Sequence, residues 1–157
     1  ELVARDPVSV PQVDSSGDYF RGMALSSDGR RLYAAFRSPD SLAVFDVAPD
    51  GTPVLRGLVV LGGSPSMVAV ASSGPSGQDR VCVTDYSGDA VFVVDPAAMT
   101  VVDRVVMGNG PYGIAVVEDA SLGIRRAYVP LFEENGLGVI DLDPASATFH
   151  VEIGRVK

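Results

Sequence analysis

Short apolar runs alternate along the chain with turn-forming Gly, Pro and Asp, roughly every 8 to 12 residues, a spacing typical of β-strands. The runs are rich in valine and too short for helices. The first group predicts four strands, at residues 22–26, 31–36, 42–47 and 54–61. The sequences SDGR and PDGT predict tight turns between the first two and the last two strands, because glycine accepts the positive φ that such turns need.

The same four-strand plan is repeated three times. Residues 30–51, 79–98 and 125–146 superimpose, with Asp46 and Asp95 separated by 49 positions and Asp95 and Asp141 by 46. A period of this length belongs to propeller blades or helical repeats, and the strand pattern favours blades. The third strands, LAVFDV, AVFVVD and LGVIDL, are apolar at odd and even positions alike. They are therefore expected to be buried on both faces, as in sheets stacked around a propeller axis. In a two-layer sandwich, apolar and polar residues would alternate along each strand, because one face of each sheet is solvated.

The segments NGPYGIAV, AYVPLF, VIDLDP and VCVTDYSGDAVFVVDP resemble the YVTN-type β-propeller repeat over residues 17–157. The resemblance implies an all-β propeller of four-stranded antiparallel blades, in a cell-surface or secreted, extracytoplasmic protein of bacteria. It implies a non-enzymatic binding or scaffolding module. The alternatives are part of a larger propeller oxidoreductase or lyase with its catalytic residues in further blades, and a half-propeller that assembles with itself.

The repeat predicts blades at residues 17–62, 63–108 and 109–157, with residues 1–16 as the outer strand of a preceding blade. Three blades do not close a ring, because propellers usually have four to eight. The expected partners are further blades of the same protein or a second copy of the chain. Both terminal blades are expected to present exposed apolar faces, so that the chain alone would not be a monomer.

Composition excludes some partners. The net charge of -8 and the pI near 4.4 disfavour nucleic acid, since a phosphate backbone would be repelled. No uninterrupted apolar run approaches the ~18 residues of a membrane-spanning helix.

Two residues that often carry chemistry have structural explanations. His150, the only histidine, is expected in an outer strand at the register of Arg104, exposed to solvent, which disfavours haem ligation and acid–base catalysis. Cys82, the only cysteine, falls in a doubly buried strand and is expected to be an inert core thiol.

Recurring aspartates and glycines are assigned to turns. Asp46, Asp95 and Asp141 recur at the end of the third strands, where a carboxylate can accept hydrogen bonds from backbone N–H groups of the following turn. Glycines 62, 63, 108 and 110 are assigned to turns between blades, since no helix or P-loop lysine follows them. No EF-hand pattern occurs. The sequence thus assigns no catalytic residue, cofactor site or metal site.

The candidate binding surface is the mouth of the channel, where loops entering the inner strands meet loops joining second and third strands. Mixed arginines, carboxylates and tyrosines there could hold a peptide, a carbohydrate or a divalent cation, although ordinary solvated loops would look the same. The candidate ligand-binding residues are Arg21, Arg37, Ser66, Asp85, Tyr86, Tyr112, Glu133 and Glu134.

Overall fold

The computed structural model describes residues 20–157, and within them the chain forms three antiparallel sheets of four strands each. The strand expected at residues 1–16 lies outside the described residues. Within the described part of the chain, no helix is long and apolar enough to cross a membrane. The all-β class with four-stranded antiparallel units is confirmed.

Each sheet is built from consecutive strands, and we call each a blade. Blade 1 contains β1 (Phe20–Leu25), β2 (Arg31–Phe36), β3 (Ser41–Val47) and β4 (Pro53–Val60). Blade 2 contains β5 (Pro65–Ala71), β6 (Arg80–Asp85), β7 (Ala90–Asp95) and β8 (Thr100–Val106), with a short 3-10 turn at Pro75–Gly77. Blade 3 contains β9 (Ala115–Asp119), β10 (Ile124–Leu131), β11 (Gly136–Asp141) and β12 (Glu152–Val156).

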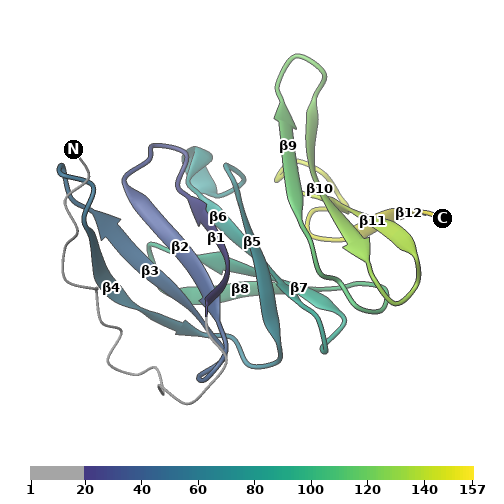
Figure 1. Cartoon of the computed structure of the whole chain (residues 1–157). Helices are drawn as coiled ribbons and strands as arrows, with labels where there is room; N and C mark the ends of the chain where they lie inside the picture. Colours follow the sequence, from purple (N-terminus) through teal and green to yellow (C-terminus); the bar gives the residue numbers. More distant parts are fainter. Residues whose placement is uncertain (1–19) are drawn as a thin grey trace.

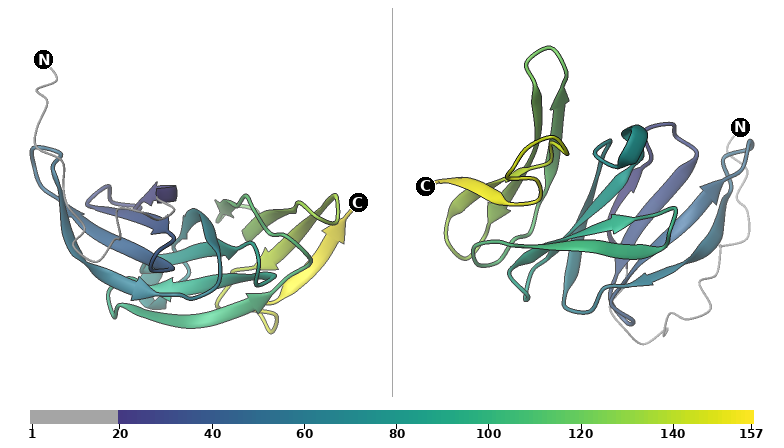
Figure 2. Two further views of the ribbon diagram at one scale, coloured as in Figure 1. Left: turned by 60° about the horizontal axis from the view of Figure 1, so that its bottom comes forward. Right: turned by 180° about the vertical axis from the view of Figure 1, so that it is seen from behind.

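The blades follow one another along an arc that does not close (Figures 1 and 2). The innermost strands of blades 1 and 2 approach closely at Gly22, where a Cβ would lie only 2.6 Å from the Cα of Met67. A side chain at this position would therefore push the two inner strands apart.

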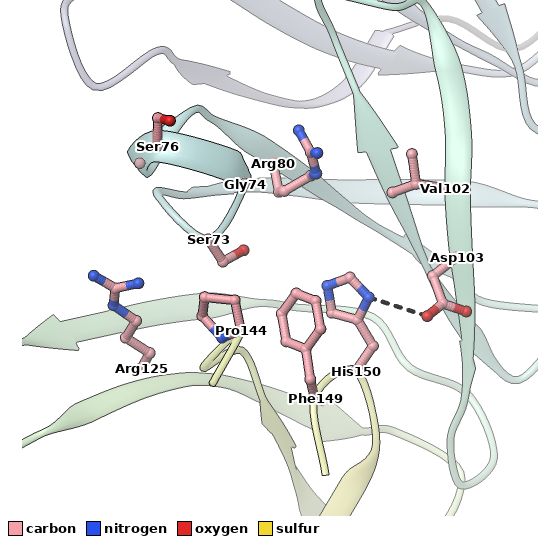
Figure 3. Close-up of a pocket in the computed structure, with 11 residues that line it drawn as sticks. Ser73, Gly74, Ser76, Arg80, Val102, Asp103, Arg125, Pro144, Phe149 and His150 are labelled. Atoms are coloured by element: carbon pink, nitrogen blue, oxygen red, sulfur yellow. Dashed lines mark hydrogen bonds and ion pairs between the residues drawn. The ribbon is translucent and has the colours of Figure 1, made fainter. Parts of the chain in front are cut away.

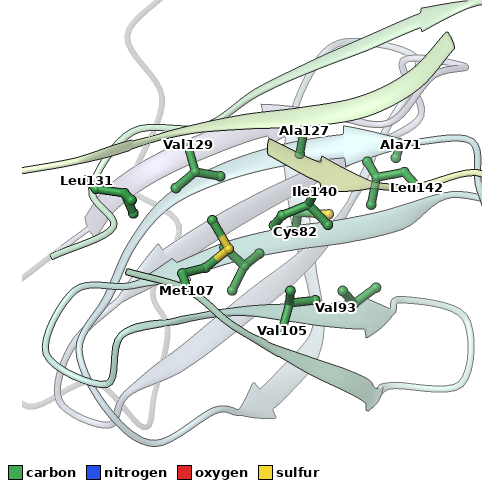
Figure 4. Packing of buried hydrophobic residues seen from close by; sticks show 11 residues of the cluster. Ala71, Cys82, Val93, Val105, Met107, Ala127, Val129, Leu131, Ile140 and Leu142 are labelled. Carbon is green, nitrogen blue, oxygen red and sulfur yellow. The ribbon is translucent and has the colours of Figure 1, made fainter. Parts of the chain in front are cut away.

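Apolar side chains between the blades form two of the cores. Between blades 1 and 2, Tyr33 and Val44 pack with Val81 and Val94. Between blades 2 and 3, the buried side chains include Cys82, Val93, Val105, Ala127, Val129, Leu131 and Ile140 (Figure 4). The third strands β3 and β7 are buried at consecutive positions, so the prediction of burial on both faces is confirmed for them. It does not hold fully for β11, where Leu137 and Val139 are only half-buried.

The two terminal faces differ from each other. On the face of blade 1 that is turned away from blade 2, Ala34, Phe36 and Phe45 are at most 5% exposed. Met23 and Leu25, opposite Ala34 and Leu32 on the same face, are 60% and 57% exposed, so the predicted exposed apolar surface is present there in part. On the outward face of blade 3, Val117 is 43% exposed and Val156 is 60% exposed. Among the described residues, both terminal faces therefore carry exposed apolar side chains that a further packing partner could cover.

The predicted turns have the expected backbone. Gly29 and Gly51, in SDGR and PDGT, have φ of 69° and 84°. Gly62 and Gly63 lie between β4 and β5 with φ of 74° and 68°, so they form a turn between blades. These are conformations that glycine adopts readily and other L-residues rarely do.

Gly110 gives a test of the turn before β9. Its φ is 66°, and a Cβ there would lie 2.9 Å from Cγ of Glu133. We expect Gly110→Val to lower the free energy of unfolding by ~1–3 kcal/mol, because a β-branched residue is strained in this conformation. The measurement is chemical denaturation. Gly154→Val is the control, since a Cβ at Gly154 meets nothing within 4 Å and its φ is not positive. Equal losses of unfolding free energy in the two variants would contradict the placement of the turn.

Candidate functional site

The residues expected at the channel mouth fall into three groups. Arg21 lies within β1 and is exposed, while Ser66 lies within β5 and is 1% exposed. The other six lie in or next to the turns at one edge of the blades. Arg37 follows β2, Asp85 ends β6 and Tyr86 follows it, Tyr112 precedes β9, and Glu133 and Glu134 join β10 to β11.

The structure brings Tyr86, Tyr112 and Glu133 together with Phe132, and we call these four residues the aromatic rim. The Tyr86 ring lies 6.1 Å from that of Tyr112 and 6.4 Å from that of Phe132, centroid to centroid. The Tyr86 hydroxyl donates a hydrogen bond of 3.0 Å to Oε1 of Glu133, which raises the pKa of Tyr86. Phe132 is 73% exposed and Tyr112 is 43% exposed, so large apolar surfaces face solvent here.

Phe132 was not among the sequence candidates. It directly follows β10 and precedes two glutamates in the sequence LFEEN, and its apolar type reads as a continuation of the strand. The available signal was an aromatic residue at the position where the strand must turn.

Asp85 has a structural role in the same region. Its side chain is 3% exposed, and its Oδ1 accepts hydrogen bonds from the backbone N–H of Ser64 at 2.7 Å and of Gly88 at 3.1 Å. It thereby ties the turn between blades 1 and 2 to the β6–β7 turn that carries Tyr86. Contact between Asp85 and a ligand stays a prediction.

Glu134 and Arg37 also have partners within the chain. Glu134 accepts a hydrogen bond from the Asn109 backbone N–H at 2.8 Å and pairs with Nη1 of Arg155 at 2.9 Å. Arg37 donates a hydrogen bond from Nη2 to the Ser66 hydroxyl at 3.4 Å. The Arg37–Ser66 contact joins blades 1 and 2, whereas the Glu134–Arg155 pair lies within blade 3. Ligand binding by these residues stays a prediction.

The expectation for His150 is wrong. It lies in the turn between β11 and β12, with φ of 60°, and its side chain is only 7% exposed. Nδ1 lies 3.0 Å from Oδ2 of Asp103 on β8, so the imidazole joins blade 3 to blade 2. The Phe149 ring stacks on it at a centroid distance of 3.7 Å. The β11–β12 connection, residues 142–151, is longer than the β7–β8 connection, residues 96–99, which breaks the alignment with Arg104.

His150 borders a cavity of about 660 Å³ between blades 2 and 3 (Figure 3). The cavity is lined by the β5–β6 loop, by β8 and by the β11–β12 turn, and therefore lies at the blade edge opposite the aromatic rim. Burial lowers the pKa of His150 from its ordinary value of 6.5, outweighing the hydrogen bond to Asp103 that raises it.

This lowered pKa makes stability depend on pH. Below pH 6.5 the unfolded chain binds a proton at His150 before the folded chain does, so the free energy of unfolding should fall as the pH falls from 6.5 through the folded-state pKa. Above pH 6.5 this contribution is fully present. Urea denaturation between pH 7.5 and 5.5 measures the slope; these pH values bracket about one unit either side of the ordinary histidine pKa. His150→Asn, which tolerates the positive φ, should flatten it. The same slope in the variant would exclude His150 as the cause.

The other sequence candidates have the following environments. Cys82 is fully buried, and burial raises the pKa of its thiol to about 12, as expected for a core residue. Asp95 accepts hydrogen bonds from the backbone N–H of Ala97 and Ala98, and Asp141 from that of Asp143.

Asp46 differs from the other two recurring aspartates. It lies in ion pairs with Arg31 at 3.5 Å and Arg56 at 3.8 Å, so its assignment to a turn is wrong. Within residues 20–157, no three His, Cys, Asp or Glu side chains are grouped so as to hold a metal ion.

Comparison with solved structures identifies the architecture. Hydrazine synthase of Kuenenia stuttgartiensis matches 98% of this chain and 39% of its own, with a TM-score of 0.67 and 23% identity. A dihydro-heme d1 dehydrogenase matches 89% of this chain and 28% of its own, with a TM-score of 0.66 and 16% identity. Virginiamycin B lyase of Staphylococcus aureus matches 78% of this chain and 38% of its own, with a TM-score of 0.56 and 14% identity.

The fold is that of a partial β-propeller. The chain spans less than half the length of the proteins it matches, as expected for a segment with too few blades to close a ring. No family model matches the chain, and no curated protein matches it in sequence. At these identities the likeness concerns the fold alone.

Proposed function

We propose that the chain is a non-enzymatic recognition module of a YVTN-type, extracytoplasmic β-propeller, which binds basic side chains of an extended peptide at the aromatic rim. The exposure of Phe132, at 73%, and of Tyr112, at 43%, carries this proposal. Two exposed rings from different loops, beside a third ring, form a platform of the kind that anchors ligands.

The charges around the aromatic rim favour a cation over a neutral ligand. Aromatic faces attract ammonium and guanidinium groups, and the Glu133 carboxylate lies beside the Tyr86 ring. The net charge of -8 would also speed the approach of a basic peptide. A peptide is therefore favoured over a neutral carbohydrate.

The test is calorimetric titration with a short peptide that contains two lysines, compared with the same peptide acetylated on both lysines. Acetylation removes the positive charge and should abolish binding. Phe132→Ser should weaken binding of the lysine peptide roughly two- to fivefold, the size of one exposed cation–π contact.

Leu122→Ser is the matched control, since Leu122 is 69% exposed in the β9–β10 turn at the opposite blade edge. It should leave binding unchanged. Equal binding of the acetylated peptide, an unchanged affinity in Phe132→Ser, or binding of a neutral oligosaccharide instead of the peptide would contradict the proposal.

A second candidate is a segment of a larger propeller enzyme, favoured by the names of the matched structures, which include a synthase, a dehydrogenase and a lyase. Its catalytic groups would then lie in further blades. A haem absorption band in the purified native protein, together with loss of peptide binding, would favour this candidate over the recognition module.

A further inference from the structure

The cavity between blades 2 and 3, which we call the inter-blade cavity, contains two buried polar atoms that lack partners among the described residues. These are Oγ of Ser73 and Nε2 of His150. Ser73 is 2% exposed and the His150 side chain 7% exposed. Buried polar atoms in folded proteins almost always have a hydrogen-bond partner. Two such atoms that border one cavity are therefore available to hydrogen-bond a group bound there.

The two atoms belong to the same space. Figure 3 shows the Ser73 hydroxyl turned toward the side of the His150 ring that faces away from Asp103. Phe149, stacked on the imidazole, and the hydrogen bond to Asp103 hold the ring in place. The orientation of Nε2 is thus fixed by the fold rather than chosen by a ligand.

The tautomer of His150 defines what Nε2 needs. A carboxylate only accepts hydrogen bonds, so Nδ1 carries the proton that lies between His150 and Asp103. In the neutral ring Nε2 is then an acceptor and requires a donor. A hydroxyl group satisfies both atoms at once, because it can donate to Nε2 and accept from the Ser73 hydroxyl.

A positive charge lies at the other end of the inter-blade cavity. Arg125, at the beginning of β10, lines the cavity beyond Pro144 (Figure 3). It forms no ion pair with another residue in the range 20–157, whereas Arg80, also in the lining, pairs with Asp95 at 3.2 Å. The planar guanidinium of Arg125 suits a carboxylate, which it can bind through two hydrogen bonds.

We propose that the inter-blade cavity binds a small hydroxylated carboxylate, with a hydroxyl between His150 Nε2 and Ser73 Oγ and the carboxylate against Arg125. Phe149 and Pro144 provide an apolar wall for the carbon skeleton. The volume of about 660 Å³ is ample for a molecule of monosaccharide size. The site is separate from the aromatic rim and does not depend on the peptide-binding proposal.

The test uses the sole histidine as its reporter, in the whole 157-residue chain and in the assembly that it forms in solution. The imidazole ¹⁵N resonances are followed by NMR during titration with galacturonate and, separately, with galactose. Galacturonate should shift the Nε2 resonance in a saturable way, and galactose, which lacks the carboxylate, should bind roughly tenfold more weakly.

Two variants separate the contacts. Arg125→Gln should reduce the affinity for galacturonate to that for galactose, and should leave galactose unaffected. Ser73→Ala should weaken both sugars. Arg126→Gln, an exposed neighbour on the other face of β10, is the matched control and should bind as the wild type does.

Three results would overturn the proposal. The first is an Nε2 resonance that stays in place up to the solubility limit of galacturonate, as expected if water alone satisfies the two atoms. The second is equal affinity for galacturonate and galactose in the wild type. The third is wild-type affinity for galacturonate in Arg125→Gln, a comparison that holds even if Ser73→Ala does not fold.

Discussion

Replacing Asp85 with alanine should lower the free energy of unfolding by ~3 kcal/mol. The carboxylate accepts hydrogen bonds from the backbone of Ser64 and Gly88 at 2.7 and 3.1 Å, and hydrogen bonds to a charged group contribute roughly 1.5–3 kcal/mol each. Alanine would leave both donors without this acceptor, and its smaller side chain would leave a void below the turn. The measurement is urea denaturation at neutral pH.

Asp46→Ala is the matched control. Its carboxylate is 53% exposed and pairs with Arg31 and Arg56 on the surface, so its loss should cost less than about 1 kcal/mol. Asp85→Asn keeps one oxygen acceptor, so its free energy of unfolding should lie between those of the wild type and Asp85→Ala. Equal losses in Asp46→Ala and Asp85→Ala would show that the buried hydrogen bonds do not stabilise the turn.

Asp85→Ala should also affect the aromatic rim, because Asp85 fixes the β6–β7 turn that carries Tyr86. Loss of peptide binding in this variant at temperatures where it remains folded would show that the rim depends on the turn. It would not by itself show contact between Asp85 and the ligand.

The strands and their order were accessible to sequence reasoning because the signals are local. The predicted range 31–36 is β2, and the predicted range 42–47 is β3 except for its first residue, Ser41. In both, apolar runs end at Asp, Gly or Pro, and each blade repeats the same pattern. The burial of β3 and β7 on both faces also followed from residue type, since neither strand alternates with polar positions.

The two sites were less accessible because they depend on contacts between blades. His150 and Asp103 are distant in the sequence and meet only because the β11–β12 turn folds back onto β8. No local sequence pattern predicts where that turn folds or which strand it contacts. Phe132 was missed for a related reason: its exposure depends on the absence of a neighbour, which residue type does not reveal.

The chain alone should sediment above its monomer mass of 16.3 kDa at micromolar concentration. On blade 3 the face turned away from blade 2 carries Tyr128, Leu137 and Val139, bordered by Val117 and Val156 at 43% and 60% exposure. The equivalent face of blade 2, with Cys82 and Val93, is buried against blade 3. An apolar face of this kind in water favours association, here with a second copy of the chain, and further blades would cover it in a closed ring.

Val139→Asp tests whether this face drives the association. A charge that is buried without a partner is costly, so the variant should dissociate at a concentration at least about tenfold higher, or sediment as a monomer. Val106→Asp is the control, since Val106 is 67% exposed on the outer strand β8 and should leave the assembly unchanged. A stable 16.3 kDa species in the wild type would contradict the prediction, because the open face of blade 3 would then be tolerated in water.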